Sequence, residues 1–83
     1  MNSRKIYNQF NSILKNANQK NYQIKKCLRL LKDDYKEILE NSFFKRIYDY
    51  WWVDCYSVTN YYRKRFRAIR SFVCLFNVMN ETN

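Results

Sequence analysis

Residues 24–39, IKKCLRLLKDDYKEIL, determine how this chain folds. Their apolar side chains recur at steps of three and four residues, which is the spacing of one face of an α-helix. That apolar set consists of Ile24, Cys27, Leu28, Leu31, Tyr35, Ile38 and Leu39. Charged residues fill most of the positions between them, so the opposite face is polar. The pattern predicts an amphipathic helix over residues 21–41 that packs its apolar face against other helices.

The same spacing continues on both sides of this segment. A first helix over residues 3–17 is predicted by the apolar set Ile6, Phe10, Ile13, Leu14 and Ala17. Downstream, the spacing predicts one long third helix over residues 42–79. Capping and β-branched residues lower the helix propensity near residues 57–60, so we expect a bend there. The sequence thus predicts a single all-α domain over residues 1–83, a small three-helix bundle.

The composition excludes most kinds of active site. The 83 residues include no glycine, no proline and no histidine. Glycine-rich phosphate loops and nucleophile elbows need glycine, and histidine is the commonest general base and a frequent zinc ligand. The acidic residues Asp33, Glu37 and Glu40 lie beside Lys32 and Lys36, as ordinary ion-pair partners on a helix do. We therefore expect no enzyme activity, no catalytic residue and no metal site.

Three cysteines, Cys27, Cys55 and Cys74, are an odd number at wide spacing, and no CxxC pair occurs. A disulfide-bonded small domain normally has a denser and even set. We therefore expect all three to be reduced and to face the apolar interior, in a reducing compartment. No apolar run approaches the 18 residues that a membrane-spanning helix requires.

A strongly basic balance points to an anionic partner. Sixteen lysines and arginines against seven acidic residues give a net charge of +9. One cluster is dense enough to bind phosphates or carboxylates: Arg63, Lys64, Arg65, Arg67 and Arg70. This cluster favours nucleic acid, for example in a ribosome-associated protein, as an alternative function. The other alternative is a solvated face that keeps a small domain in solution.

Aromatic residues are unusually abundant, with six Phe, eight Tyr and two Trp. Three short helices hide only part of that surface, so we expect an aromatic interface with a partner. Its candidate residues are Phe43, Tyr48, Trp51 and Trp52. The alternative is that these rings pack against neighbouring helices. Binding to a membrane surface through Trp51 and Trp52 is a third, disfavoured possibility.

Five short phrases of the sequence resemble the LYR-motif adaptor family of mitochondria, and most of all the adaptor of the cysteine desulfurase. The matching phrases are Ile6-Tyr7-Asn8, Asn21-Tyr22, Lys25-Lys26-Cys27-Leu28-Arg29, Asp33-Asp34-Tyr35-Lys36-Glu37 and Ile69-Arg70-Ser71-Phe72-Val73-Cys74-Leu75. The first stands where the family has Leu-Tyr-Arg, so Asn8 replaces the motif arginine. Tyr35 replaces the phenylalanine of the fourth phrase.

The resemblance implies a three-helix adaptor that binds acylated acyl carrier protein and stabilises a larger enzyme, the cysteine desulfurase of iron–sulfur cluster assembly. Ile6 and Tyr7 would line the entrance for the acyl-phosphopantetheine of the carrier, with Asn8 beside them. The adaptor itself would bind no cofactor directly. The acidic carrier would lie on Lys25, Lys26, Arg29, Lys32 and Lys36. The family implies a location in the mitochondrial matrix; otherwise we expect a cytoplasmic protein.

Overall fold

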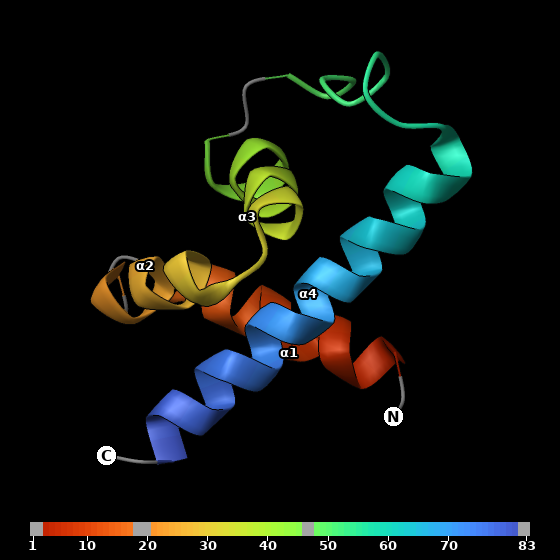
Figure 1. Cartoon of the computed structure of the whole chain (residues 1–83). Coiled ribbons are helices and arrows are strands. Elements are labelled where there is room, and N and C mark those ends of the chain that lie inside the picture. Colours follow the sequence, from red (N-terminus) through yellow and green to blue (C-terminus); the bar gives the residue numbers. More distant parts are fainter. Residues whose placement is uncertain (1–2, 18–20, 46–47, 82–83) are drawn as a thin grey trace.

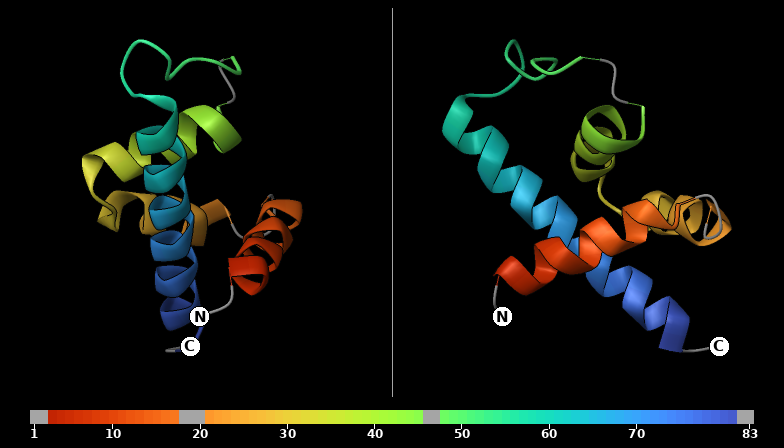
Figure 2. Two further views of the ribbon diagram at one scale, coloured as in Figure 1. Left: turned by 90° about the vertical axis from the view of Figure 1, so that its right-hand side faces the viewer. Right: turned by 180° about the vertical axis from the view of Figure 1, so that it is seen from behind.

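A computed structural model of the chain describes residues 3–17, 21–45 and 48–81. Every regular element in these ranges is a helix, which confirms the all-α fold. The elements are α1 (Ser3–Lys15), α2 (Asn21–Leu30), α3 (Asp33–Leu39), the π-helical turn η1 (Glu40–Phe44) and α4 (Val58–Glu81). Helix α4 runs across the molecule and contacts each of the other three; α1 crosses one side of it, while α2 and α3 pack on another (Figures 1 and 2).

The predicted helix over residues 21–41 is interrupted between α2 and α3, so the prediction of one continuous helix was wrong. Lys32 has φ −58° and ψ 151°, an extended conformation that ends one helix and precedes the next. Two acidic residues, Asp33 and Asp34, occupy the first turn of α3. Negative charge is favourable at a helix N-terminus, which makes this a natural place for a new helix to begin. The apolar residues predicted on both sides of the break are nevertheless buried, except for Tyr35, which is half-buried.

The prediction of one helix over residues 42–79 was also wrong. The chain leaves the helical path after η1, forms turns within residues 49–55, and becomes helical again at Val58. The predicted weak point at 57–60 is the start of α4 rather than a bend. There the Ser57 hydroxyl accepts a hydrogen bond from the backbone N–H of Asn60 at 3.3 Å, as an N-cap residue does.

The main core lies where α1, α2 and α3 meet α4. Phe10 is at its centre, and its ring makes edge-on contacts with Phe43 at 5.0 Å and Phe72 at 5.7 Å between centroids. The π-helical turn brings both Phe43 and Phe44 against this core, where Phe44 lies 6.0 Å from Phe72. Interlocking rings of this kind stabilise beyond the area that they bury, which suits a chain with so many aromatic residues.

A second, smaller cluster, the satellite core, consists of Ile38, Trp51, Trp52 and Tyr61. Trp51 and Trp52 are only 8% and 6% exposed, and Trp52 stacks on Tyr61 at 4.2 Å. The prediction that these two tryptophans form an exposed interface was therefore wrong. The non-helical segment before α4 allows both indoles to fold back onto α3 and α4, so the alternative of internal packing holds for them.

The three cysteines are free, as predicted, but only Cys27 is buried. Burial raises the pKa of its thiol. The prediction of an apolar environment was wrong for Cys55 and Cys74, which are both exposed. Cys55 belongs to the turn segment, and Cys74 is an exposed residue of α4. Within the described part of the chain, no helix has the length and apolar character to span a bilayer.

Candidate partner-binding surfaces

The outward side of α2 carries a mixed basic and apolar surface. Ile24, Cys27 and Leu28 face the core, and the opposite side of the helix presents Tyr22, Lys26, Arg29 and Leu30. We refer to these four residues as the α2 surface. Tyr22 is 73% exposed and Leu30 is 61% exposed, so two large apolar side chains flank two cations in open solvent. Exposed apolar groups beside charges are typical of a surface that a partner covers.

No residue of the α2 surface has an ion-pair partner among the described residues. The two ion pairs found there join Lys45 to Glu40 and Lys64 to Asp34, neither of them on α2. Lys26 and Arg29 therefore present uncompensated positive charge. Of this surface, sequence reasoning identified Lys26 and Arg29 but missed Leu30. The available signal was that Leu30 is an apolar residue outside the three-and-four spacing, which places it away from the core face.

The remaining basic residues predicted to face a carrier are spread over two helices. Lys25 is exposed on α2 beside the α2 surface. Lys32 is exposed at the break, with its amine 5.7 Å from the centre of the Tyr35 ring. Lys36 is half-buried on α3. On one continuous helix, the five residues predicted to contact the carrier would share a face. Because α3 is a separate helix, they do not form one continuous surface; these residues are Lys25, Lys26, Arg29, Lys32 and Lys36.

The three residues that stand at the LYR position differ in their surroundings. Ile6 is 2% exposed, Tyr7 is half-buried with its ring 5.7 Å from that of Phe66, and Asn8 is exposed. Ile6 borders a pocket of about 150 Å³ between α1 and α4, rimmed by Lys5 and Gln9. Binding sites for small molecules usually measure ~300–1,000 Å³. The pocket is therefore too small for a long acyl chain.

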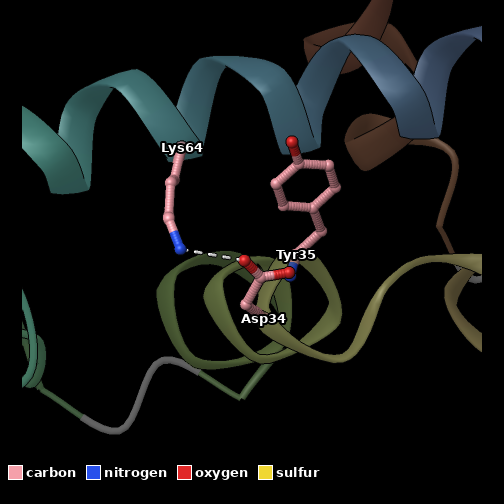
Figure 3. A network of polar contacts seen from close by, with 3 residues as sticks. All are labelled: Asp34, Tyr35 and Lys64. Atoms are coloured by element: carbon pink, nitrogen blue, oxygen red, sulfur yellow. Dashed lines mark hydrogen bonds and ion pairs between the residues drawn. The ribbon is translucent and has the colours of Figure 1, made fainter.

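The predicted basic cluster of α4 divides into three groups. Lys64 reaches α3 and donates a hydrogen bond to Asp34 Oδ2 at 3.0 Å (Figure 3). Arg65 stacks over Phe43, with its guanidinium carbon 4.9 Å from the ring centre. The other three arginines, Arg63, Arg67 and Arg70, are exposed on one side of the helix and have no ion-pair partner in the described ranges. We call these three the α4 stripe.

The ion pair between α3 and α4 shifts the pKa values of both partners. Burial alone would raise the pKa of Asp34. The hydrogen bonds from Lys64 and from the Tyr35 backbone N–H, together with the charge of Lys64, outweigh it and lower that pKa. The hydrogen bond to Asp34 and its negative charge raise the pKa of Lys64. Both groups are therefore held in their charged forms, and Lys64 is not free to bind a partner.

A shallow groove of about 400 Å³ lies between α3 and α4. Its lining residues are Tyr35, Arg67, Arg70, Ser71 and Cys74, and we call it the α3–α4 groove. The Tyr35 side chain extends from α3 with its hydroxyl directed at α4 (Figure 3). None of the described residues that line this groove carries a carboxylate, which distinguishes it from a surface on which charges cancel.

The remaining aromatic candidates border a different pocket. Phe43 and Tyr48 line a pocket of about 190 Å³ that also contacts Trp51, Trp52 and Arg65. Tyr48 is exposed, and Phe43 is half-buried against the main core. Arg65 lies over both Phe43 and Tyr62, so a cation of the chain itself already covers these rings.

Nowhere in the described ranges do three or more potential metal ligands gather. Comparison of the chain with protein-family models, with curated proteins and with solved structures finds no match.

Proposed function

We propose that this chain is a non-catalytic helical adaptor that docks an acidic, carrier-type protein on the α2 surface. The observation that carries the proposal is the placement of exposed Tyr22 and Leu30 on either side of unpaired Lys26 and Arg29. Contact affinity comes mostly from apolar and aromatic anchors, while charges align the partner and accelerate its approach. A negatively charged helix with apolar side chains matches this surface on both counts.

The resemblance to LYR-motif adaptors gives that partner a name. In this proposal it is acyl carrier protein, and the larger protein that the complex stabilises is the cysteine desulfurase of iron–sulfur cluster assembly in the mitochondrial matrix. The matching phrases lie on α1, α2, α3 and α4, all of which contribute to one core. The structure supports the proposal at the α2 surface. The pocket of about 150 Å³ at Ile6 is smaller than a long acyl chain requires.

The first test measures the affinity of the purified chain for acyl carrier protein. Lys26→Glu with Arg29→Glu places two negative charges against the acidic helix, and like charges across an interface cost several kcal/mol. We expect at least a 100-fold loss of affinity. The matched control is Arg67→Glu with Arg70→Glu, which changes the net charge of +9 by the same amount on another helix. It should bind within about threefold of the unmodified chain.

A second pair of variants separates contact from charge. Leu30→Ala removes an exposed apolar anchor without changing charge, and we expect about a tenfold loss of affinity, since truncating an anchor costs more than 1 kcal/mol. Val78→Ala removes another exposed apolar side chain, on α4, and should have no effect. Equal affinities for all four variants would contradict docking on α2. Comparing carrier with and without its acyl chain then shows whether the chain contributes.

A further inference from the structure

We propose that a second surface, the α4 stripe together with the α3–α4 groove, binds the phosphate backbone of single-stranded nucleic acid. The full basic cluster of residues 63–70 is narrowed by the structure to three arginines, because Lys64 and Arg65 are engaged elsewhere. Two hydroxyl-bearing residues from the groove, Tyr35 and Ser71, join them. The surface shares no residue with the α2 surface, so experiments test this inference independently of the proposed function.

The spacing of the stripe suits a run of phosphates. Arg63, Arg67 and Arg70 stand at i, i+4 and i+7, so they follow one side of α4 over about 10 Å at a rise of 1.5 Å per residue. Strand phosphates follow one another every ~3.4 Å along a duplex axis and farther apart in an extended strand, so two or three of them match this length. Free guanidinium groups bind phosphate oxygens in a two-point fashion.

The groove adds a concave seat for one of these phosphates. Arg67 and Arg70 belong to both the stripe and the groove, and the Tyr35 and Ser71 hydroxyls have no hydrogen-bond partner in the described part of the chain. A backbone phosphodiester has two charged oxygens, and each can accept more than one hydrogen bond, so the guanidinium groups and hydroxyls of the groove can bind it together. The row of arginines that continues from this seat favours a chain of phosphates over a single acidic side chain.

The charges around the groove agree with an anionic ligand. Lys32 holds its amine 5.7 Å from the Tyr35 ring, which adds positive charge at the α3 side. Asp34 is the acidic neighbour of Tyr35, and Lys64 neutralises it. Asp33 and Glu37 are exposed, at positions of α3 opposite to Ile38 and Leu39. No unpaired carboxylate of α3 therefore faces the seat.

A flexible strand fits this shape better than a duplex does. One phosphate enters a groove between two helices while its neighbours lie along a straight stripe, which requires the backbone to bend within a few nucleotides. Duplex DNA is stiff over ~150 base pairs, so it would contact the stripe without entering the groove. Single-stranded binding of this kind depends on backbone charge and tolerates any sequence.

The first experiment measures the affinity of the chain for a labelled oligouridine of about twelve nucleotides by fluorescence anisotropy, over a series of salt concentrations. Each phosphate contact to a single strand contributes about −0.7 to the slope of log K against log salt. Three contacts predict a slope of about −2. Arg67→Ala with Arg70→Ala should reduce the slope to about −0.7 and weaken binding at least tenfold at low salt.

The matched control is Lys26→Ala with Arg29→Ala, which removes the same two charges from the α2 surface and should leave the slope unchanged. If both double variants lower affinity and slope equally, binding is a diffuse effect of the net charge, and the proposal is wrong. It is also wrong if the unmodified chain does not bind the oligonucleotide, or if a duplex of equal charge binds more tightly. Tyr35→Phe with Ser71→Ala should weaken binding about fivefold without altering the slope.

The cysteines supply a second readout that places the ligand. Cys74 lines the groove, whereas Cys55 lies in the turn segment before α4, and both are exposed. Bound oligouridine should slow the alkylation of Cys74 by N-ethylmaleimide at least fivefold and leave Cys55 unaffected, as measured by peptide mass. Equal protection of the two thiols, or protection of Cys55 alone, would overturn the assignment to this groove.

Discussion

The Ser42 hydroxyl joins two members of the satellite core, Trp51 and Tyr61, through a single oxygen atom. The Trp51 indole N–H donates to this hydroxyl at 3.0 Å, and the Tyr61 hydroxyl lies 2.7 Å from the same atom. Both aromatic residues are buried, so their polar atoms depend on this one partner. Ser42 lies within the π-helical turn and Tyr61 in the first turn of α4, so this oxygen links the two elements.

Replacing Ser42 with alanine removes one oxygen atom but should lower the stability of the fold markedly. An unsatisfied polar group in a buried site costs about 1–3 kcal/mol, and we expect Ser42→Ala to lower the free energy of unfolding by that amount. Ser12→Ala is the matched control, because the Ser12 hydroxyl is exposed and donates only to the carbonyl oxygen of Asn8. It should change stability by less than about 0.5 kcal/mol. Urea unfolding measures both, and equal effects would mean that water satisfies Trp51 and Tyr61.

The Asp34–Lys64 pair makes stability depend on acidity in a defined direction. The pKa of Asp34 is lowered in the folded chain, so its contribution is complete above the ordinary pKa of a carboxyl. That contribution is lost as the pH falls through the lowered pKa. Lys64→Met removes the main cause of the lowering. The variant should therefore lose less stability than the unmodified chain between about pH 5 and about pH 2.

Asp34→Asn serves as the control for this titration. It removes the titrating group and should give the same shallower acid dependence as Lys64→Met, measured by urea midpoints across that range. A steeper acid dependence in either variant would show that the ion pair does not govern this carboxyl. The side chains are about one third exposed, which screens the pair and keeps the effect small.

At the scale of elements, the break between α2 and α3 lacks a side-chain cap. Lys32 occupies the N-cap position of α3, and its side chain makes no capping hydrogen bond. Serine at this position accepts a bond from a free backbone N–H of the first turn, whereas alanine cannot. We expect Lys32→Ser to be more stable than Lys32→Ala by about 0.5–2 kcal/mol.

The comparison between these two variants isolates the cap, because both lose the contact of the lysine amine with the Tyr35 ring. Thermal unfolding followed by circular dichroism is sufficient, since 1 kcal/mol shifts the midpoint by about 4–8 °C in a domain of this size. Identical midpoints for serine and alanine would mean that α3 does not begin at Asp33 in solution.

These helix ends show where sequence reasoning succeeds and where it stops. The three-and-four spacing identified buried residues such as Ile6, Phe10 and Ile38, because burial of one helix face depends only on local periodicity. The same spacing persists across Lys32 and across the segment that precedes Val58, although the backbone there is not helical. Periodicity alone does not reveal these interruptions. The first coincides with the acidic pair Asp33 and Asp34, and the second with the indoles of Trp51 and Trp52, which pack in the satellite core.

The charged residues of the candidate surfaces were predictable from the sequence, whereas the groove was not. Lys26, Arg29 and the arginines of the α4 stripe follow from charge and helical register alone. The groove does not, because Tyr35 and Ser71 are far apart in the sequence and meet only when α3 packs on α4. Likewise, no local pattern predicts that Lys64 pairs with Asp34 or that Arg65 stacks on Phe43. Long-range packing decides which charges remain free.

The whole molecule carries far more positive charge than it neutralises. Its net charge is +9, and the described residues contain two ion pairs between side chains. Exposed cations lie on α1, α2 and α4, and both α1 and α2 pack against α4, so folding brings like charges together. Repulsion of this kind opposes a compact state, and salt or an anionic partner relieves it.

We therefore expect the unfolding midpoint to rise with sodium chloride, by about 5 °C between about 0.01 M and about 0.15 M, over which the screening length falls from ~30 Å to ~8 Å. Lys25→Glu with Arg63→Glu lowers the net charge by four at two exposed positions and should at least halve that rise. Phosphate at equal ionic strength should stabilise the unmodified chain further, because an anion that binds only the folded state adds to its stability. Arg67→Ala with Arg70→Ala should remove this additional gain while preserving the response to chloride. A midpoint that falls as chloride is added would contradict this prediction, because it would mean that attraction between charges outweighs repulsion in the folded chain.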